Sequence, residues 1–152
     1  INKNSEFLEF SLGKSYYNQI IDIERDQGSA FDAIKQFEKF LSRYPSSIYA
    51  DEIKKKKISV NNQLSGQEMS VGRYYLNKKK YLASIKRFQG VVTNYPETRH
   101  YPEALFRLVE VYAILGIKDS VKNIVNKISK EHKGSIWEKK ALDIYASNFI
   151  EG

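Results

Sequence analysis

Residues 30–45 read AFDAIKQFEKFLSRYP, and residues 81–96 read YLASIKRFQGVVTNYP. When the two stretches are aligned at their Tyr-Pro dipeptides, their apolar residues match at a constant offset of 51 positions. The matched pairs are Ile34 with Ile85, Phe37 with Phe88, and Leu41 with Val92. These residues recur at helical spacing, and a proline stops each run. The sequence therefore predicts two copies of one amphipathic helix.

Small and aromatic residues around these helices follow the tetratricopeptide pattern, a 34-residue helix–turn–helix repeat. We predict that they pack the two helices of each repeat together, because helices cross closely only where their side chains are small. One copy consists of Gly72, Tyr75, Ser84, Phe88 and Pro96. An earlier copy, with a longer turn, consists of Gly13, Tyr16, Ala33, Phe37 and Pro45. A third copy, without the proline, runs through Leu105, Leu108, Tyr112, Val121, Val125 and Ile128.

The segment between Pro45 and Tyr81 contains no proline. Its apolar residues stay within an arc of about 80° when each residue turns the helix by roughly 100°. This continuity predicts one long helix near residues 47–78, which continues through Ser65 and Gly66. We therefore expect an all-α tetratricopeptide-repeat solenoid of about seven helices. It would be a single domain over residues 1–152, with about three repeats and a closing helix at residues 135–149.

Composition limits the function more than it identifies it. The chain of 152 residues has no cysteine, which excludes disulfides, thiolate metal sites and cysteine nucleophiles. No apolar stretch is long enough to span a membrane. The formal net charge is +7, from 19 Lys and 6 Arg against 18 acidic residues. Residues 77–152 carry 14 basic and 8 acidic side chains, so an acidic partner surface is expected to bind that half.

Catalytic, cofactor and metal sites have no specific signal. Asp22, Glu24 and Asp26 stand at the first three ligand spacings of a calcium loop, but Gln27 occupies the position that requires glycine. An acidic turn between helices is the better interpretation. The two histidines stand 32 residues apart, outside any zinc pattern, and neither a nucleophile elbow nor a dinucleotide-binding motif occurs. The sequence predicts no enzyme, no cofactor and no metal.

Several strings in the chain are more specific than the general repeat pattern. They are GQEMSVGRYYL at residues 66–76, the helix at residues 81–96, RHYPEAL at residues 99–105, SYYNQI at residues 15–20 and the RDQ turn at residues 25–27. Together they resemble the BamD (ComL-type) family of outer-membrane β-barrel assembly lipoproteins, particularly its alphaproteobacterial branch. The resemblance covers roughly residues 7–137.

That resemblance implies a periplasmic solenoid of five repeats, tethered to the outer membrane by a lipidated N-terminal cysteine. It implies a scaffold subunit of the BAM machinery that helps to insert outer-membrane proteins. In the family, the C-terminal repeats dock the POTRA region of the barrel-forming subunit, and other assembly lipoproteins and unfolded substrates are further partners. We expect this chain to be the C-terminal part of such a protein, without the anchoring cysteine and the first two repeats.

The repeat register also predicts surfaces for binding protein. Seven residues on the first helix of each pair are expected to point into a concave groove, although helix packing or plain solvent exposure explains each of them equally well. They are Phe10, Lys14, Tyr17, Met69, Arg73, Phe106 and Glu110. A second candidate surface is a basic turn and helix start for an acidic docking face. It contains Arg99, His100, Tyr101 and Arg107.

Two other functions stay open at this point. The string YPSSIYA at residues 44–50 is shared with other periplasmic tetratricopeptide adaptors that coordinate the cell envelope or division. Lysines at residues 54–57 and 78–80, interleaved with tyrosines, are compatible with nucleic-acid binding. Arginine is scarce, however, and the aromatic residues occupy packing positions. We therefore favour a protein partner and expect no nucleic-acid binding.

Overall fold

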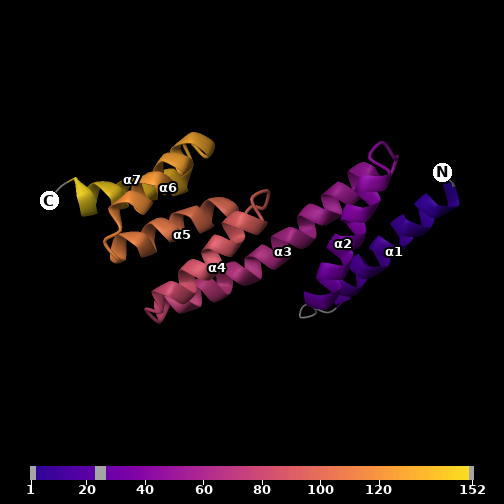
Figure 1. The fold of residues 1–152 in the computed structure, drawn as a ribbon, viewed down its shortest axis with the longest axis horizontal. Helices are drawn as coiled ribbons and strands as arrows, with labels where there is room; N and C mark the ends of the chain where they lie inside the picture. Colours follow the sequence, from indigo (N-terminus) through magenta and orange to yellow (C-terminus); the bar gives the residue numbers. More distant parts are fainter. Residues whose placement is uncertain (1–2, 23–26, 151–152) are drawn as a thin grey trace. The chain divides into compact units, whose positions relative to one another are not determined.

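Helices account for the whole regular structure of the part that can be described, which is residues 3–22 and 27–150 of a computed structural model (Figure 1). In chain order they are α1 (Lys3–Asp22), α2 (Gln27–Arg43), α3 (Ala50–Asn77), α4 (Tyr81–Asn94), α5 (Tyr101–Ile114), α6 (Lys118–Glu131) and α7 (Ile136–Phe149). The all-α prediction with about seven helices is confirmed. Glu24 and Asp26 of the rejected calcium pattern, and most of the RDQ turn, lie outside the described residues.

The two Tyr-Pro dipeptides end α2 and α4 in the same way. In each turn the tyrosine N–H donates to a carbonyl four residues earlier, at 2.8 Å from Tyr44 and 2.9 Å from Tyr95. A second N–H donates back to the tyrosine carbonyl, at 3.1 Å from Ser47 and 3.2 Å from Thr98. The sequence repeat is therefore also a repeat of hydrogen bonds, and it fixes where α3 and α5 begin.

Helix α3 is the long helix that the apolar pattern predicts, and it continues through Ser65 and Gly66. The chain divides into two compact units, residues 1–64 and residues 65–152, with the boundary inside this helix. Each unit has its own apolar core. The organisation into a single domain stays a prediction.

In the first unit, α1 packs on α2 through a glycine. A Cβ atom on Gly13 would lie 2.9 Å from the Phe37 ring, so only glycine permits this close approach without a shift. Phe37 and Ala33 are fully buried. The remaining buried apolar residues of this unit include Phe10, Ala30, Phe40, Tyr44, Ala50, Ile53, Val60 and Leu64.

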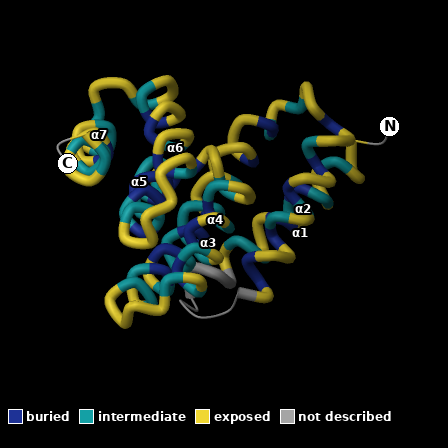
Figure 2. Tube along the Cα trace, turned by 60° about the vertical axis from the view of Figure 1, so that its left-hand side comes forward, coloured by how far each residue is buried: buried dark blue, intermediate teal, exposed yellow. Residues whose placement is uncertain are grey.

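The second unit repeats the arrangement with α3 and α4. A Cβ atom on Gly72 would lie 2.5 Å from the Phe88 ring, and Ser84 and Phe88 are fully buried. One cluster joins α3, α4 and α5 through Met69, Phe88, Val91, Ala104, Leu108 and Val111. A second joins α5, α6 and α7 through Leu105, Phe106, Val109, Val121, Val125, Ile128 and Ala141, among others. Figure 2 shows how buried and exposed residues are distributed along the trace of the chain.

Candidate protein-binding site

Four charged side chains form a continuous chain of ion pairs in the second unit, across α3 and α5. Arg73 on α3 donates to both carboxylate oxygens of Glu103 on α5, at 3.1 and 3.0 Å. Arg107 donates to Glu103 at 3.1 Å and to Glu110 at 2.6 Å. The four side chains are between 17 and 38% exposed, so a partner can reach the outer side of the network. We call Arg73, Glu103, Arg107 and Glu110 the charged row.

Within the charged row, each charged side chain forms an ion pair with an oppositely charged neighbour. Partial burial raises the pKa of the Glu103 carboxyl, but hydrogen bonds from Arg107 and Arg73 outweigh it and lower the pKa overall. Burial acts to lower the pKa of Arg107, but the hydrogen bonds that Arg107 donates to Glu110 and Glu103 outweigh it and raise the pKa overall. These shifts favour the charged forms of Glu103 and Arg107, and basic and acidic side chains alternate along the row. This fixed alternation can recognise a partner that presents the opposite alternation.

The predicted basic turn does not form one cationic surface. Arg107 is neutralised within the charged row, and Tyr101 is buried, with its hydroxyl donating to Glu131 at 2.8 Å. Burial and this hydrogen bond raise the pKa of Tyr101 to about 12. The His100 ring lies against α3, where its Nε2 would be 3.0 Å from a Cβ on Gly66. Of the four predicted residues, only Arg99 is well exposed.

In the first unit, the predicted groove residues of α1 meet the start of α3. Phe10 stacks on Tyr49 with ring centroids 4.4 Å apart. The Lys14 ammonium lies 5.6 Å from the Phe10 ring, and Lys56 lies 4.3 Å from the Tyr17 ring. Tyr49 and Lys56 were not predicted to belong to this cluster. Tyr49 stands directly before α3 and Lys56 lies in its second turn, and their separation of seven residues was the signal that they share one face.

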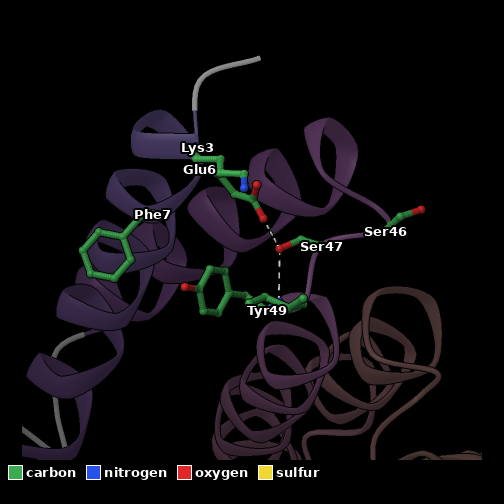
Figure 3. Close-up of a pocket in the computed structure, with 7 residues that line it drawn as sticks. Lys3, Glu6, Phe7, Ser46, Ser47 and Tyr49 are labelled. Atoms are coloured by element: carbon green, nitrogen blue, oxygen red, sulfur yellow. Dashed lines mark hydrogen bonds between the residues drawn. The ribbon is translucent and has the colours of Figure 1, made fainter.

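A hollow of about 380 Å³ lies at the start of α1, also in the first unit (Figure 3). Its lining consists of Lys3, Glu6, Phe7, Ser46, Ser47, Ile48 and Tyr49. The Ser47 hydroxyl donates to Glu6 and accepts from the Tyr49 N–H at 3.1 Å, which ties the α2–α3 turn to α1. Phe7 and Ile48 are large exposed apolar side chains at its rim. Periodicity did not predict this hollow, because it depends on a turn packing beside a helix end.

Comparison with known proteins gives the family. The family model described as an outer membrane lipoprotein, YfiO, matches residues 1–128. The chain belongs to this family. It is 34% identical over 147 residues to the outer membrane protein assembly factor BamD of Caulobacter vibrioides, covering 97% of this chain and 48% of that protein. It is 40% identical over 123 residues to the BamD of Rickettsia prowazekii, covering 81% of this chain and 49% of the relative.

The resemblance to alphaproteobacterial BamD proteins is thus confirmed by relatives of that group. The BamD of Vibrio cholerae is more distant, with 29% identity over 99 residues, 65% of this chain and 41% of that protein. The chain spans about half the length of the curated relatives it matches.

Three of the predicted groove residues of this BamD-family chain are packed inside it instead. Met69 is fully buried beneath α4 and α5, and Phe10 and Phe106 are at most 6% exposed. The Phe106 ring contacts Trp137 of α7, with centroids 5.5 Å apart. The helical period identified their faces as apolar, but it did not show that neighbouring helices cover them. Lys14, Tyr17, Arg73 and Glu110 stay as candidates on the surface.

Other kinds of site have little support in the structure. Within the part of the chain that the structure describes, no cluster of three or more His, Asp or Glu side chains is arranged to hold a metal ion. None of the described helices combines the length and hydropathy that crossing a bilayer requires. Among the residues discussed above, the charged row, the aromatic–lysine cluster of α1 and α3, and the hollow at Phe7 are the candidate surfaces for binding protein.

Proposed function

We propose that this chain is the partner-docking part of an outer membrane protein assembly factor, and that it acts as a scaffold without catalysis. Membership in a family of outer membrane lipoproteins and two relatives named as BamD support this role. The proposal puts the chain on the periplasmic side of the outer membrane. Its partner there is the POTRA region of the barrel-forming subunit.

The charged row is the observation that supports a docking surface on this chain. It lies on α3 and α5, which are the first helices of two consecutive repeats, and such helices line the binding face of a repeat stack. Each of its carboxylates and guanidiniums is already held in place by a neighbour, so binding costs little further side-chain ordering. A partner carrying acidic and basic side chains in the opposite order would gain both affinity and register.

Calorimetric titration of the chain with the purified POTRA region of the cognate barrel subunit tests this surface. We expect Arg73→Ala to raise the Kd about tenfold, because it removes an exposed donor and leaves Glu103 with one partner fewer. Arg87→Ala is the matched control. Arg87 makes the same two-pronged pair with Glu68, at 3.1 Å to both oxygens, but it lies on α4 away from the row.

Both variants are expected to keep the helical content of the parent chain, which circular dichroism checks. Arg87→Ala should change the Kd by less than about twofold, as is usual for a charge outside the interface. If both substitutions weaken POTRA binding equally, the charged row is not the docking surface. Absence of binding by the folded parent chain would overturn the proposed partner.

A further inference from the structure

The positive charge of the second unit is concentrated in one hairpin. Residues 69–96, which cover the end of α3 and all of α4, contain six basic side chains and no acidic one. By contrast, residues 97–152 contain 9 basic and 8 acidic side chains. Two of the six cations are neutralised, Arg73 by Glu103 and Arg87 by Glu68. The other four are Lys78, Lys79, Lys80 and Lys86.

These four lysines are all exposed, and none forms a salt bridge with any residue that the structure describes. Three of them make up the α3–α4 turn, and Lys86 lies in the second turn of α4. We call these four lysines, together with Tyr74 and Leu82, the hairpin edge. Uncompensated cations this close together repel one another, so they favour the approach of an anionic surface.

The lysine at position 79 is present despite a conformational cost. Lys79 has a φ of 59°, which a side chain disfavours, and the Lys80 N–H donates across the turn to the Tyr75 carbonyl at 2.9 Å. The α5–α6 turn has the same hydrogen bond, from Ile117 to Tyr112 at 2.9 Å, but there the residue with positive φ is Gly116, at 72°. Glycine is the unstrained choice for this turn, so folding alone does not explain a cation at position 79.

Apolar side chains stand out beside the lysines. Leu82, in the first turn of α4, is 80% exposed, and Tyr74 is 57% exposed with the Lys78 ammonium 5.8 Å from its ring. The α5–α6 turn adds three exposed apolar residues, Ile114, Leu115 and Ile117. Because α3 and α5 each lead into one of these turns, both turns lie at the same end of the second unit (Figure 1).

We propose that the hairpin edge binds the surface of a bilayer that contains anionic phospholipid. The lysines contact the headgroups, and Leu82 and Tyr74 enter the interface between headgroups and acyl chains. Exposed aliphatic side chains gain from such burial, whereas they contribute little to nucleic-acid binding, which relies on aromatic stacking and on arginine. The inference does not depend on the proposed docking of the POTRA region.

Co-sedimentation of the chain with vesicles tests this inference. We expect binding to vesicles of phosphatidylcholine mixed with phosphatidylglycerol, and no binding to phosphatidylcholine alone. Each lysine removed should weaken binding about fivefold at low salt, and high salt should weaken binding of the parent chain in the same direction. Leu82→Ser should weaken binding as well, while leaving its dependence on salt unchanged.

Lys79→Gly separates lipid binding from a structural role. It removes one charge and also relieves the positive φ, so we expect about fivefold weaker binding together with an unchanged or higher Tm. The control is Lys130→Gln, an exposed lysine at the opposite end of α6, which should bind vesicles like the parent chain.

Any one of four results would overturn the inference. The first three are failure of the parent chain to sediment with phosphatidylglycerol vesicles, equal loss of binding in Lys79→Gly and Lys130→Gln, and binding by Lys79→Gly that matches the parent. The fourth is displacement of the chain from the vesicles by a single-stranded oligonucleotide that the chain binds more tightly than the lipid. That result would make the hairpin edge a nucleic-acid-binding surface.

Discussion

At the scale of single residues, the fold depends on two glycine–phenylalanine contacts, Gly13 with Phe37 and Gly72 with Phe88. In each, the ring fills the space that any other residue would use for its Cβ. Both phenylalanines are fully buried, and each such burial stabilises the folded state by about 2 kcal/mol. These contacts were predictable because the repeat pattern fixes their spacing, and the reason for the pattern is steric.

The contact at Gly72 gives a direct stability test. Gly72→Ala places a Cβ 2.5 Å from the Phe88 ring, so we expect the free energy of unfolding to fall by about 1–3 kcal/mol despite the better helix propensity of alanine. Gly90→Ala is the matched control on α4, because nothing lies within 4 Å of its added Cβ. It should be neutral or stabilising by about 0.5–1 kcal/mol. Urea unfolding measures both, and similar values for the two would contradict the close contact.

At the scale of elements, helix ends were predictable where a local signal sets them. Proline ends α2 and α4, and Ser135 begins α7 by accepting a hydrogen bond from the Glu138 N–H at 3.1 Å. Pairing between helices was not predictable in the same way. Glu103 contacts Arg73, 30 residues away, and a helical period carries no information about partners on another helix. This is why the charged row and the hollow at Phe7 emerge only from the structure.

The hydrogen bond between Tyr101 of α5 and Glu131 of α6 makes stability depend on pH. The pKa of Tyr101 is raised to about 12 from its ordinary value of 10.0, by burial and by the hydrogen bond to Glu131. A raised folded-state pKa means that the stabilisation is complete below pH 10 and is lost as the pH rises through 12. We expect this loss to reach about 2 kcal/mol.

Tyr101→Phe removes the titrating group, so its unfolding free energy should decline less between pH 10 and pH 12 than that of the parent chain. Absorbance titration of the phenolates gives an independent measurement, because burial also raises the pKa of Tyr95, so the variant should contain one late-ionising tyrosine fewer than the parent. If the two proteins lose stability in parallel over that interval, the shift of Tyr101 is not real.

At the scale of the whole molecule, charge distinguishes the two units. Residues 1–64 contain 10 basic and 9 acidic side chains, whereas residues 65–152 contain 15 and 9. The sequence located this excess in the C-terminal half, but it did not show how the excess is arranged. In the structure, the charged row on α3 and α5 is balanced and adds nothing to this excess, whereas the hairpin edge on α3 and α4 contributes four uncompensated lysines. The sequence predicted one basic surface, containing Arg107, for an acidic partner. The structure instead has two surfaces of different chemistry, the charged row and the hairpin edge.

Site-specific photocrosslinking in intact cell envelopes tests the docking claim most directly. A photoreactive amino acid at position 110, on the charged row, should crosslink to the barrel-forming subunit. The same amino acid at the exposed position of Gln89 on α4 should give little or no such product. A crosslink to that subunit from position 89, with none from position 110, would contradict the claim that this chain docks its partner through the charged row.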